Sequence, residues 1–418
     1  MPVLSPTSAF SRITALAALR PVHAAFSWLH VNPKTIMDWQ VQLTAIPAPT
    51  HGEQARAQWL AQRFTEAGLS QVEIDAAGNV LGILPAKRGP ENIAPVVLLS
   101  AHIDTVFPAG TPLHPVLNGD RLEAPGACDN AGGVAGMLAV ATALLHAGVE
   151  LPAPLAILGN VGEEGEGDLR GVRHIYEHSA LAGRIAAHIV LDGPGADAAV
   201  TQAVGSRRYQ ITITGPGGHS FTDAGTPNPI AALASALSTL ADTPLPEEPR
   251  TTLNLGTIRG GISVNSIPES AQATVDFRST DPGQLVRLEV ALHRALEDAV
   301  EHCNIKVKAS EAGSRRRLSF EISKIGDRPA AQLPDDSPML ATLRAVDRHL
   351  GLRTDLRLGS TDANLPLSLG VPALSMGAGG EGGAAHTLRE WYSPKDRELA
   401  LKRVMLLTLA MLEWAAEL

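Results

Sequence analysis

Residues 96–108 read VVLLSAHIDTVFP and carry the clearest indication of the fold class. It opens on a short apolar run, and such a run is typical of a strand buried on both faces of a parallel sheet. His102 and Asp104 follow directly after the run. Because open α/β sheets bind ligands just outside the carboxyl ends of their strands, these two residues stand where such a fold carries its site.

The alternation of strands and helices extends on both sides of this stretch. Helical spacing of apolar residues is found over residues 34–43, 53–67, 130–148, 337–350 and 396–418. Strand patterns are found over residues 79–84, 155–159, 187–191 and 373–377. Strands that alternate with helices predict an α/β fold, with a mixed, largely parallel sheet flanked by helices.

The character of the chain changes after about residue 205. Two segments alternate with period two, at residues 208–214 (RYQITIT) and 271–278 (AQATVDFR). Two others have helical spacing, at residues 228–241 and 282–302. This combination predicts an antiparallel sheet with helices on one face. We therefore expect a smaller α+β domain over residues 205–318, inserted into a catalytic domain formed by residues 1–204 and 319–418.

Length and charge narrow the class of function. A chain of 418 residues is too long for one ordinary core, and its net charge of −9 argues against nucleic acid or an anionic membrane surface as the main partner. Residues 15–28 predict an amphipathic helix packed on the body, because they fall short of the ~20 unbroken apolar residues of a membrane span. Cys128 and Cys303 are the only cysteines. We expect no disulfide between them and a cytoplasmic location.

Five acidic or imidazole residues in apolar or glycine-rich contexts form a ligand set for two divalent metals of the zinc type: His102, Asp129, Glu164, Asp192 and His386. Glu163 stands beside one of them, and a metal ligand next to a free carboxylate suits metal-assisted hydrolysis. Each position alone has a plainer interpretation. His102 fits a core histidine, Asp129 a helix N-cap, and Glu163 with Glu164 a solvated acidic loop.

The motifs that contain these residues resemble a known family. They are H-x-D-T-V at 102–106, G-x-x-D-x-x-G-G at 126–133, G-x-x-x-E-E-G at 159–165, a lone acid after the next strand, and A-H-T at 385–387. Together they resemble the co-catalytic zinc metallopeptidase family, which contains peptidase T, glutamate carboxypeptidase, acetylornithine and succinyl-diaminopimelate deacylases, carnosinase and aminoacylase. The similarity runs from about Trp39 to the C-terminus, and it favours the peptidase T-like branch with its zinc-exopeptidase-like fold.

The resemblance implies two divalent metal ions, zinc or else cobalt or manganese, as cofactors. His102, Asp129 and Asp192 would hold one ion. Asp129 as a bridge, together with Glu164 and His386, would hold the second. The resemblance also implies a cis peptide bond after Asp129.

The resemblance implies catalytic roles for three further residues. Glu163 resembles the general base, and Asp104 resembles the residue that orients the ring of His102. A hydroxide that bridges the metals would attack an amide carbonyl while Glu163 moves a proton to the leaving amine. His219 in GPGGHS matches a histidine that stabilises the tetrahedral intermediate, usually in the partner subunit's site, which implies a homodimer through the smaller domain.

The substrate-binding residues implied by the resemblance are Asn265, Arg278 and the loop GSTDAN at 359–364, within it Gly359, Ser360 and Asn364. Asn265 and Arg278 resemble groups that hold the substrate's carboxylate or carbonyl oxygens. The plainer interpretations remain open: a turn residue for Asn265, a strand-surface ion pair for Arg278 and a turn histidine for His219.

The identity of the ligand at position 192 bears on the substrate. In the family this ligand tends to be Asp in aminopeptidases and dipeptidases, and Glu in carboxypeptidases and deacylases. Asp192 therefore favours an exopeptidase that acts on short peptides. The alternative is an N-acyl-amino-acid amidohydrolase with the same site. A non-catalytic binding protein is a distant alternative, since such a protein would be expected to have lost Glu163 or a metal ligand.

Overall fold

The structure, a computed structural model, describes residues 6–87, 94–305 and 317–418. The chain forms two compact units. The larger unit comprises Met1–Ala203 and Gln332–Leu418, and the smaller unit comprises Val204–Ala331. The smaller unit is thus an insertion within the larger one in the sequence.

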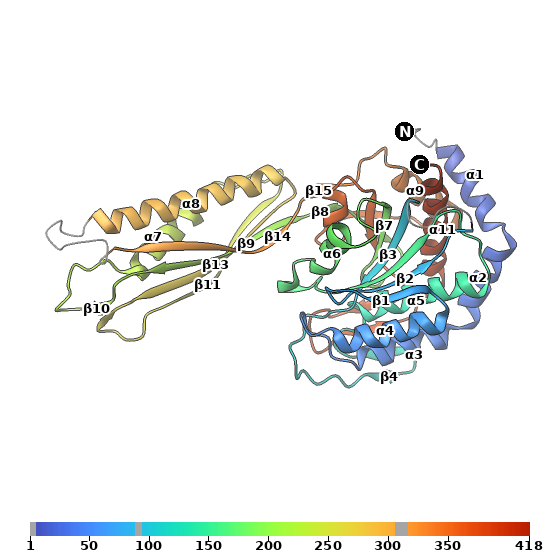
Figure 1. Ribbon diagram of the computed structural model, residues 1–418, viewed down its shortest axis with the longest axis horizontal. Helices are drawn as coiled ribbons and strands as arrows, with labels where there is room; N and C mark the ends of the chain where they lie inside the picture. Colours follow the sequence, from blue (N-terminus) through green and yellow to red (C-terminus); the bar gives the residue numbers. More distant parts are fainter. Residues whose placement is uncertain (1–5, 88–93, 306–316) are drawn as a thin grey trace. The chain divides into compact units, whose positions relative to one another are not determined.

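The larger unit is built around a nine-stranded mixed sheet (Figure 1). Its strands are β1 (Ser70–Ile74), β2 (Val80–Leu84), β3 (Val96–His102), β6 (Leu155–Asn160), β7 (Ile185–Leu191), β8 (Ala198–Ala203), β15 (Ala331–Gln332), β16 (Asp355–Gly359) and β17 (Ala373–Met376). Their order is β1-β2-β6-β3-β7-β17-β8-β15, with β16 paired to β8. Strands β6, β3, β7 and β17 run parallel, whereas β2 and β8 run antiparallel to their neighbours β6 and β17. The predicted α/β class is confirmed.

Helices flank this sheet: α1 (Pro6–Ala17), α2 (Arg20–Val31), α3 (Pro33–Thr44), α4 (Gln54–Ala67), α5 (Ala131–His146), α6 (Arg170–His178), α9 (Pro338–Leu350), α10 (Asn364–Ser368) and α11 (Arg397–Ala416). The almost wholly buried α5 and α11 pack against β3 and β7. A second, small sheet has the order β18 (Glu381–Gly383), β19 (Trp391–Ser393), β5 (Arg121–Glu123) and β4 (Val116–Asn118).

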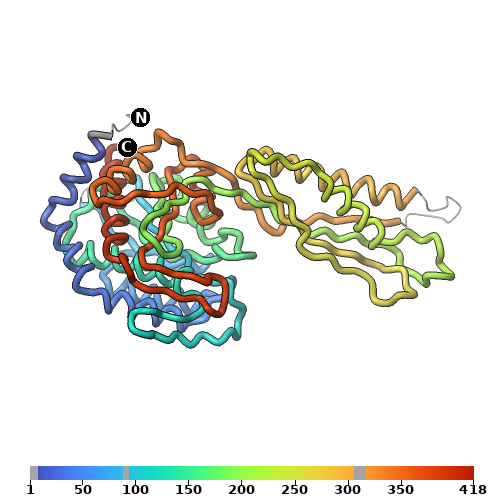
Figure 2. The backbone as a smooth tube through the Cα atoms, turned by 180° about the vertical axis from the view of Figure 1, so that it is seen from behind, coloured from blue at the N-terminus to red at the C-terminus, as the bar shows by residue number. Residues whose placement is uncertain are grey.

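The N-terminal segment differs from expectation in one detail. It forms two helices, α1 and α2, where the sequence predicted one over residues 15–28. Helix α2 begins at Arg20 and has Pro21 in its first turn, a position that suits proline. The helix buries Val22, Ala25 and Leu29 at amphipathic spacing, as predicted. Figure 2 shows this segment, in blue, beside the red C-terminal helix. No helix among the described residues is both long and apolar enough to cross a membrane.

The smaller unit is an antiparallel sheet covered by two helices. Its strands follow the order β11 (Thr251–Gly260), β13 (Ser270–Ser279), β9 (Gly205–Thr214) and β14 (Ser319–Arg328). Every second residue of β13 is buried, and those side chains share an apolar core with α7 (Pro229–Ala241) and α8 (Pro282–Ile305). The helices therefore lie on one face, as the period-two pattern predicted.

The end of the smaller unit lies one strand later than the sequence suggested. The expected boundary at residue 318 leaves β14 in the larger unit, yet β14 pairs with β9 over almost its whole length, from Ser319 to Arg328. The local pattern of a strand does not reveal which sheet receives it, because pairing is a tertiary property. Cys128 and Cys303 are both free in the structure.

Candidate metal site

The predicted ligands lie at the ends of elements of the larger unit. His102 is the last residue of β3, and Asp192 directly follows β7. Glu164 lies in the loop after β6, Asp129 lies just before α5, and His386 lies between β18 and β19. Because β3, β6 and β7 are parallel neighbours, the positions that follow them share one edge of the sheet.

Asp129 faces a different histidine with each of its carboxylate oxygens. His102 Nε2 lies 3.1 Å from Asp129 Oδ1, and His386 Nε2 lies 3.0 Å from Asp129 Oδ2. Asp192 Oδ1 is 3.8 Å from the first imidazole, and Glu164 Oε1 is 3.2 Å from the second. The donor atoms of His102, Asp129 and Glu164 all lie within 4.8 Å of one another, so these three side chains can hold a metal ion. Asp129 joins two overlapping donor sets.

The clustered carboxylates and imidazoles shift one another's pKa values. Burial raises the pKa of Glu164 to about 7, with Asp129 and Glu163 adding to the rise and the imidazoles opposing it. Burial opposes ionisation of Asp129, but hydrogen bonds from His102 and His386 hold its pKa well below the usual range. The hydrogen bond to Asp129 is the main cause that raises the pKa of His386 to about 9. A divalent cation among these groups would favour ionised carboxylates and neutral imidazoles at the same time. The donor set therefore fits a metal of the zinc type.

Asp104 has a different principal contact from the one expected. His102 Nδ1 lies 3.2 Å from the main-chain oxygen of Asp104 but 3.6 Å from its carboxylate, which is too long for a hydrogen bond. The carboxylate instead accepts the main-chain N–H groups of Glu163 at 3.0 Å and Glu164 at 2.9 Å. Burial opposes ionisation, but His102 and these N–H groups hold the pKa of Asp104 below its usual value. Asp104 therefore fixes the Glu163–Glu164 backbone as well as the neighbouring ring.

Sequence reasoning missed Asn130, which links two of the ligand loops. The Asp129–Asn130 peptide bond is cis, as predicted. The buried Asn130 side chain donates to the main-chain oxygen of Leu191 at 2.8 Å and accepts the N–H of Gly193 at 3.2 Å. It thereby holds the backbone on both sides of Asp192. The sequence placed Asn130 at the start of the helix predicted over residues 130–148 and contained no signal for these bonds, because the partner lies 61 residues away.

Sequence reasoning also missed Glu390 and Arg56. Glu390 is 1% exposed, and its carboxylate accepts three main-chain N–H groups of the loop that carries Asp129. Arg56 is equally buried, donates to the main-chain oxygens of Ile46 and Ile103, and lies in the electrostatic field of Asp104 and Glu390. Burial lowers the pKa of Arg56 to about 10, against those two carboxylates. Neither residue has a sequence signal beyond its charge.

In the smaller unit, a short strand pair, β10 (Gly218–His219) and β12 (Ser266–Ile267), brings His219 and Asn265 together. The N–H of Ser220 donates to the main-chain oxygen of Asn265 at 3.0 Å. His219 Nδ1 accepts the N–H groups of Phe221 at 3.2 Å and Thr222 at 3.3 Å. The proton of a neutral ring therefore resides on Nε2, and the exposed His219 presents a hydrogen-bond donor.

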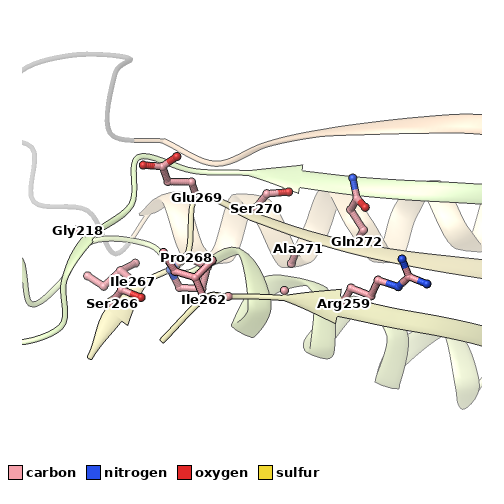
Figure 3. Close-up of a pocket in the computed structure, with 12 residues that line it drawn as sticks. Gly218, Arg259, Ile262, Ser266, Ile267, Pro268, Glu269, Ser270, Ala271 and Gln272 are labelled. Carbon is pink, nitrogen blue, oxygen red and sulfur yellow. The ribbon is translucent and has the colours of Figure 1, made fainter. Parts of the chain in front are cut away.

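A groove of about 570 Å³ lies beside this pair in the smaller unit (Figure 3). Its lining includes Arg259, Ile262, Ser266, Glu269 and Gln272. The groove is formed by residues of one unit, whereas the ligand cluster belongs to the other. It is therefore not evidence for the position of the metal site.

Arg278 is not brought to His219 and Asn265 within one copy of the smaller unit. It lies eight residues along β13 from Ser270, the end that adjoins β12, which corresponds to about 26 Å of strand. Its Nε donates to the carboxylate of Asp276 at 2.8 Å, so the strand-surface ion pair is present.

The loop after β16 contains the remaining predicted residues. Gly359 ends β16, and Ser360 follows it. Asn364 is fully buried, and its side-chain oxygen accepts the N–H of Thr361 at 2.9 Å, so this amide shapes the loop from within. The fully buried Asp362 accepts a hydrogen bond from Asn160, the last residue of β6, at 2.7 Å. That bond holds the loop at the same edge of the sheet as the predicted ligands.

The sequence model of peptidase family M20/M25/M40 matches residues 98–411, a range that contains every predicted metal ligand. The chain belongs to this family. The resemblance seen in the motifs is confirmed, and membership makes the protein an enzyme, a metal-dependent hydrolase of peptides or acyl-amino acids.

Similar proteins illustrate the breadth of the family. A probable carboxypeptidase of Aspergillus clavatus is 29% identical over 270 residues, which are 59% of this chain and 58% of that protein. A succinyl-diaminopimelate desuccinylase of Methylorubrum populi is 27% identical over 343 residues, 77% of this chain and 84% of that protein. The crystal structure of aminopeptidase PepT from Bacillus cereus superposes with a TM-score of 0.70 at 19% identity, covering 90% of this chain and 98% of that one. The last similarity confirms the fold alone.

Proposed function

We propose that the protein is a di-metal exopeptidase of the aminopeptidase or dipeptidase type that hydrolyses short peptides. The observation that carries the proposal is the position of Asp129, whose two oxygens face His102 and His386 at 3.1 and 3.0 Å. A carboxylate that bridges two metal ions needs this arrangement. His102 and Asp192 complete one donor set, and His386 and Glu164 complete the other. Zinc is the proposed metal, and cobalt or manganese fit the same donors.

When bound, such ions would polarise the amide carbonyl and lower the pKa of an attacking water from 15.7 toward ~7. The residues of the chain supply the proton transfers and the positioning. Glu163, whose backbone is held by Asp104, would accept the proton of the attacking water and return it to the leaving amine. His219 would donate its Nε2 proton to the developing oxyanion. Asn265 and Arg278, with Gly359, Ser360 and Asn364 of the loop, would contact the substrate's carboxylate and carbonyl groups.

Asp192 favours peptides over N-acyl amino acids, because in this family an Asp ligand there accompanies aminopeptidases and dipeptidases. A second candidate function is that of an N-acyl-amino-acid amidohydrolase. It is favoured by the relative from Methylorubrum populi, a desuccinylase whose alignment covers 77% of this chain. Both functions use the same donors and the same base, so only the substrate separates them.

We also propose a homodimer formed through the smaller unit. His219 lies in β10, which pairs with β12 near the Ser270 end of β13, whereas Arg278 lies eight residues further along β13, about 26 Å of strand from Ser270. One small substrate would therefore not touch both residues in a single copy. Two copies remove this difficulty. Strand β11 lies at the edge of its sheet and exposes Ile258, and Ile262 follows it with 96% exposure. An exposed apolar edge strand is a template for pairing with a second chain.

A small substrate and a second copy of the chain are the proposed partners. The net charge of −9 disfavours nucleic acid and anionic membrane surfaces. Two free cysteines suit a reducing compartment, so the cytoplasm is the proposed location.

A cleavage screen tests the proposed function. Purified protein would be supplied with zinc, cobalt or manganese, and with EDTA as the metal-free arm. The panel would set free di- and tripeptides against N-acetyl, N-succinyl and other N-acyl amino acids, with the released amines identified by mass. Glu163→Ala should abolish cleavage. Glu166→Ala, an exposed acid of the same loop, is the matched control and should not.

Metal-dependent cleavage of peptides with a free N-terminus would support the exopeptidase. Preference for N-acylated substrates would show an amidohydrolase instead, and Asp192 would then not indicate the substrate class. Absence of metal-dependent amide cleavage with either class would contradict both proposals.

A further inference from the structure

The loop that carries Asp129 and the hairpin that carries His386 are joined by one buried carboxylate. Glu390 Oε1 accepts the N–H of Cys128 at 2.8 Å and that of Asp129 itself at 2.9 Å. Glu390 Oε2 accepts the N–H of Gly126 at 2.9 Å. The main chain adds a fourth bond, from the N–H of Ala124 to the oxygen of Glu390 at 3.1 Å.

Glu390 is the buried end of an otherwise exposed segment. Residues 384–389, which include His386, are exposed, whereas Glu390 is 1% exposed. His386 adopts φ 62°, a left-handed conformation that is uncommon for a residue with a side chain. The buried side chain of Glu390 lies four residues from His386 in the sequence, and it is hydrogen-bonded to the backbone N–H of Asp129.

Asn130, the residue after Asp129, holds a different part of the site. Asn130 holds the backbone around Asp192, on the side of the first donor set. Glu390 holds the hairpin of His386, on the side of the second. Arg56, buried near both Asp104 and Glu390, supplies positive charge to each of these positioning carboxylates.

We propose that Glu390 is a positioning residue that sets the distance between Asp129 and His386 and so builds the second metal subsite before the metal arrives. This inference rests on the proposed function, because it assumes that the two side chains bind a metal. It adds to that function a specific consequence. Loss of Glu390's hydrogen bonds should weaken the His386 subsite more than the His102 subsite, which Asn130 supports separately.

Substitution by glutamine tests the carboxylate with little change of shape. One of the two terminal atoms of Gln is an NH₂ donor, which would face an N–H group of the 126–129 loop in either orientation. Glu390→Ala removes all three bonds and leaves three N–H groups without their acceptor. Because three buried N–H groups without an acceptor endanger folding of that variant, Glu390→Gln carries the test. Glu381→Gln is the matched control, since Glu381 lies in the same hairpin, is exposed, and pairs with Lys395 at 2.6 Å.

The experiment is a titration of EDTA-treated, dialysed protein with CoCl₂, followed by visible absorption and by calorimetry. Wild type and Glu381→Gln should bind two ions per chain. Glu390→Gln should bind the first ion nearly as wild type and the second 10- to 100-fold more weakly, the range typical for outer-sphere partners of metal ligands. With saturating cobalt, KM should stay within about twofold while kcat falls, since substrate contacts are unchanged.

The outcomes separate the inference from the proposed function. A wild type that binds two ions, with Glu390→Gln indistinguishable from Glu381→Gln, would overturn the role of Glu390 and leave the proposed function in place. A loss of thermal stability in Glu390→Gln without any change in cobalt affinity would mean a merely structural carboxylate, and would also overturn it. A wild type that binds no divalent ion would overturn the proposed function itself.

Discussion

The two halves of the proposed machinery differ in how firmly the structure holds them. In the larger unit, His102, Asp104, Glu163 and Glu164 are 0–7% exposed and are fixed by hydrogen bonds at the ends of buried strands. In the smaller unit, His219 is exposed, and its neighbour Phe221 is 84% exposed. Burial of this kind preorganises a site, whereas exposed groups gain defined partners only when something covers them. We therefore propose that the buried groups preorganise the metal site, and that His219 acts as an oxyanion donor only when a partner covers it.

The largest expected effect is on catalysis by the buried groups, where one substitution should remove proton transfer and leave metal binding intact. Glu163→Ala should lower kcat/KM by up to about 10⁴-fold, because a positioned general base contributes up to that factor. Cobalt binding should be unchanged, since Glu163 is the proposed base and not a ligand. Steady-state kinetics and cobalt absorption on the same preparation check both statements. A variant that loses cobalt together with activity would make Glu163 a ligand and contradict its assignment.

Metal should stabilise the larger unit alone. All five tryptophans lie in that unit, so their fluorescence reports its unfolding, while circular dichroism reports both units. Zinc at a thousandfold excess over its Kd should raise the free energy of unfolding of the larger unit by about 4 kcal/mol. His386→Ala should lose most of the gain contributed by the second ion, and Glu381→Gln should lose none. Zinc could instead stabilise, by the same amount, an unfolding transition seen by circular dichroism but not by tryptophan fluorescence. That result would contradict a site confined to the larger unit.

The exposed half is tested by mixing inactive variants. His219→Ala should lower kcat by 10²- to 10³-fold, as removal of one oxyanion donor does. If His219 acts in the partner's site, unfolding and refolding a mixture of Glu163→Ala and His219→Ala should restore about a quarter of wild-type activity. That fraction follows because half of randomly formed dimers are hybrid, and each hybrid has one intact site of two. No recovery in a mixture shown to contain hybrids would place His219 in its own subunit's site.

The positions of the predicted ligands at strand ends could be read from the sequence for a physical reason. A parallel sheet covered on both faces produces apolar runs such as 96–100, and the ligands follow those runs directly. Strands β8, β11, β14 and β16 were not predicted. Strands β11, β14 and β16 are largely exposed and lack a clear apolar pattern, and β8 (AAVTQA) buries every second residue but contains few large apolar side chains. Asn130 and Glu390 could not be predicted, since their partners lie 61 and more than 260 residues away and only the fold brings them together.

The smallest expected effect is a dependence of folding stability on pH, which arises because the interiors of the two units differ. The core of the smaller unit is apolar, whereas the larger one also buries His188, whose ring lies 2.8 Å from Ser100 Oγ and 3.2 Å from the hydroxyl of Tyr176. Burial lowers the pKa of His188 to about 3, below the ~6.5 of an unfolded chain. Neutral His188 therefore supports the fold above pH 6.5, and that support is lost as the pH falls toward 3, because only the unfolded chain takes up the proton.

Between pH 6.5 and 5 the loss should be about 2 kcal/mol, since each pH unit contributes ~1.4 kcal/mol. Urea unfolding followed by tryptophan fluorescence at both pH values measures it in the larger unit. His188→Gln should remove this part of the acid sensitivity, at whatever stability the variant starts from. His178→Gln, at a surface position of the same unit, is the control and should keep it. An unchanged pH slope in His188→Gln would mean that His188 does not contribute to the acid sensitivity of the larger unit.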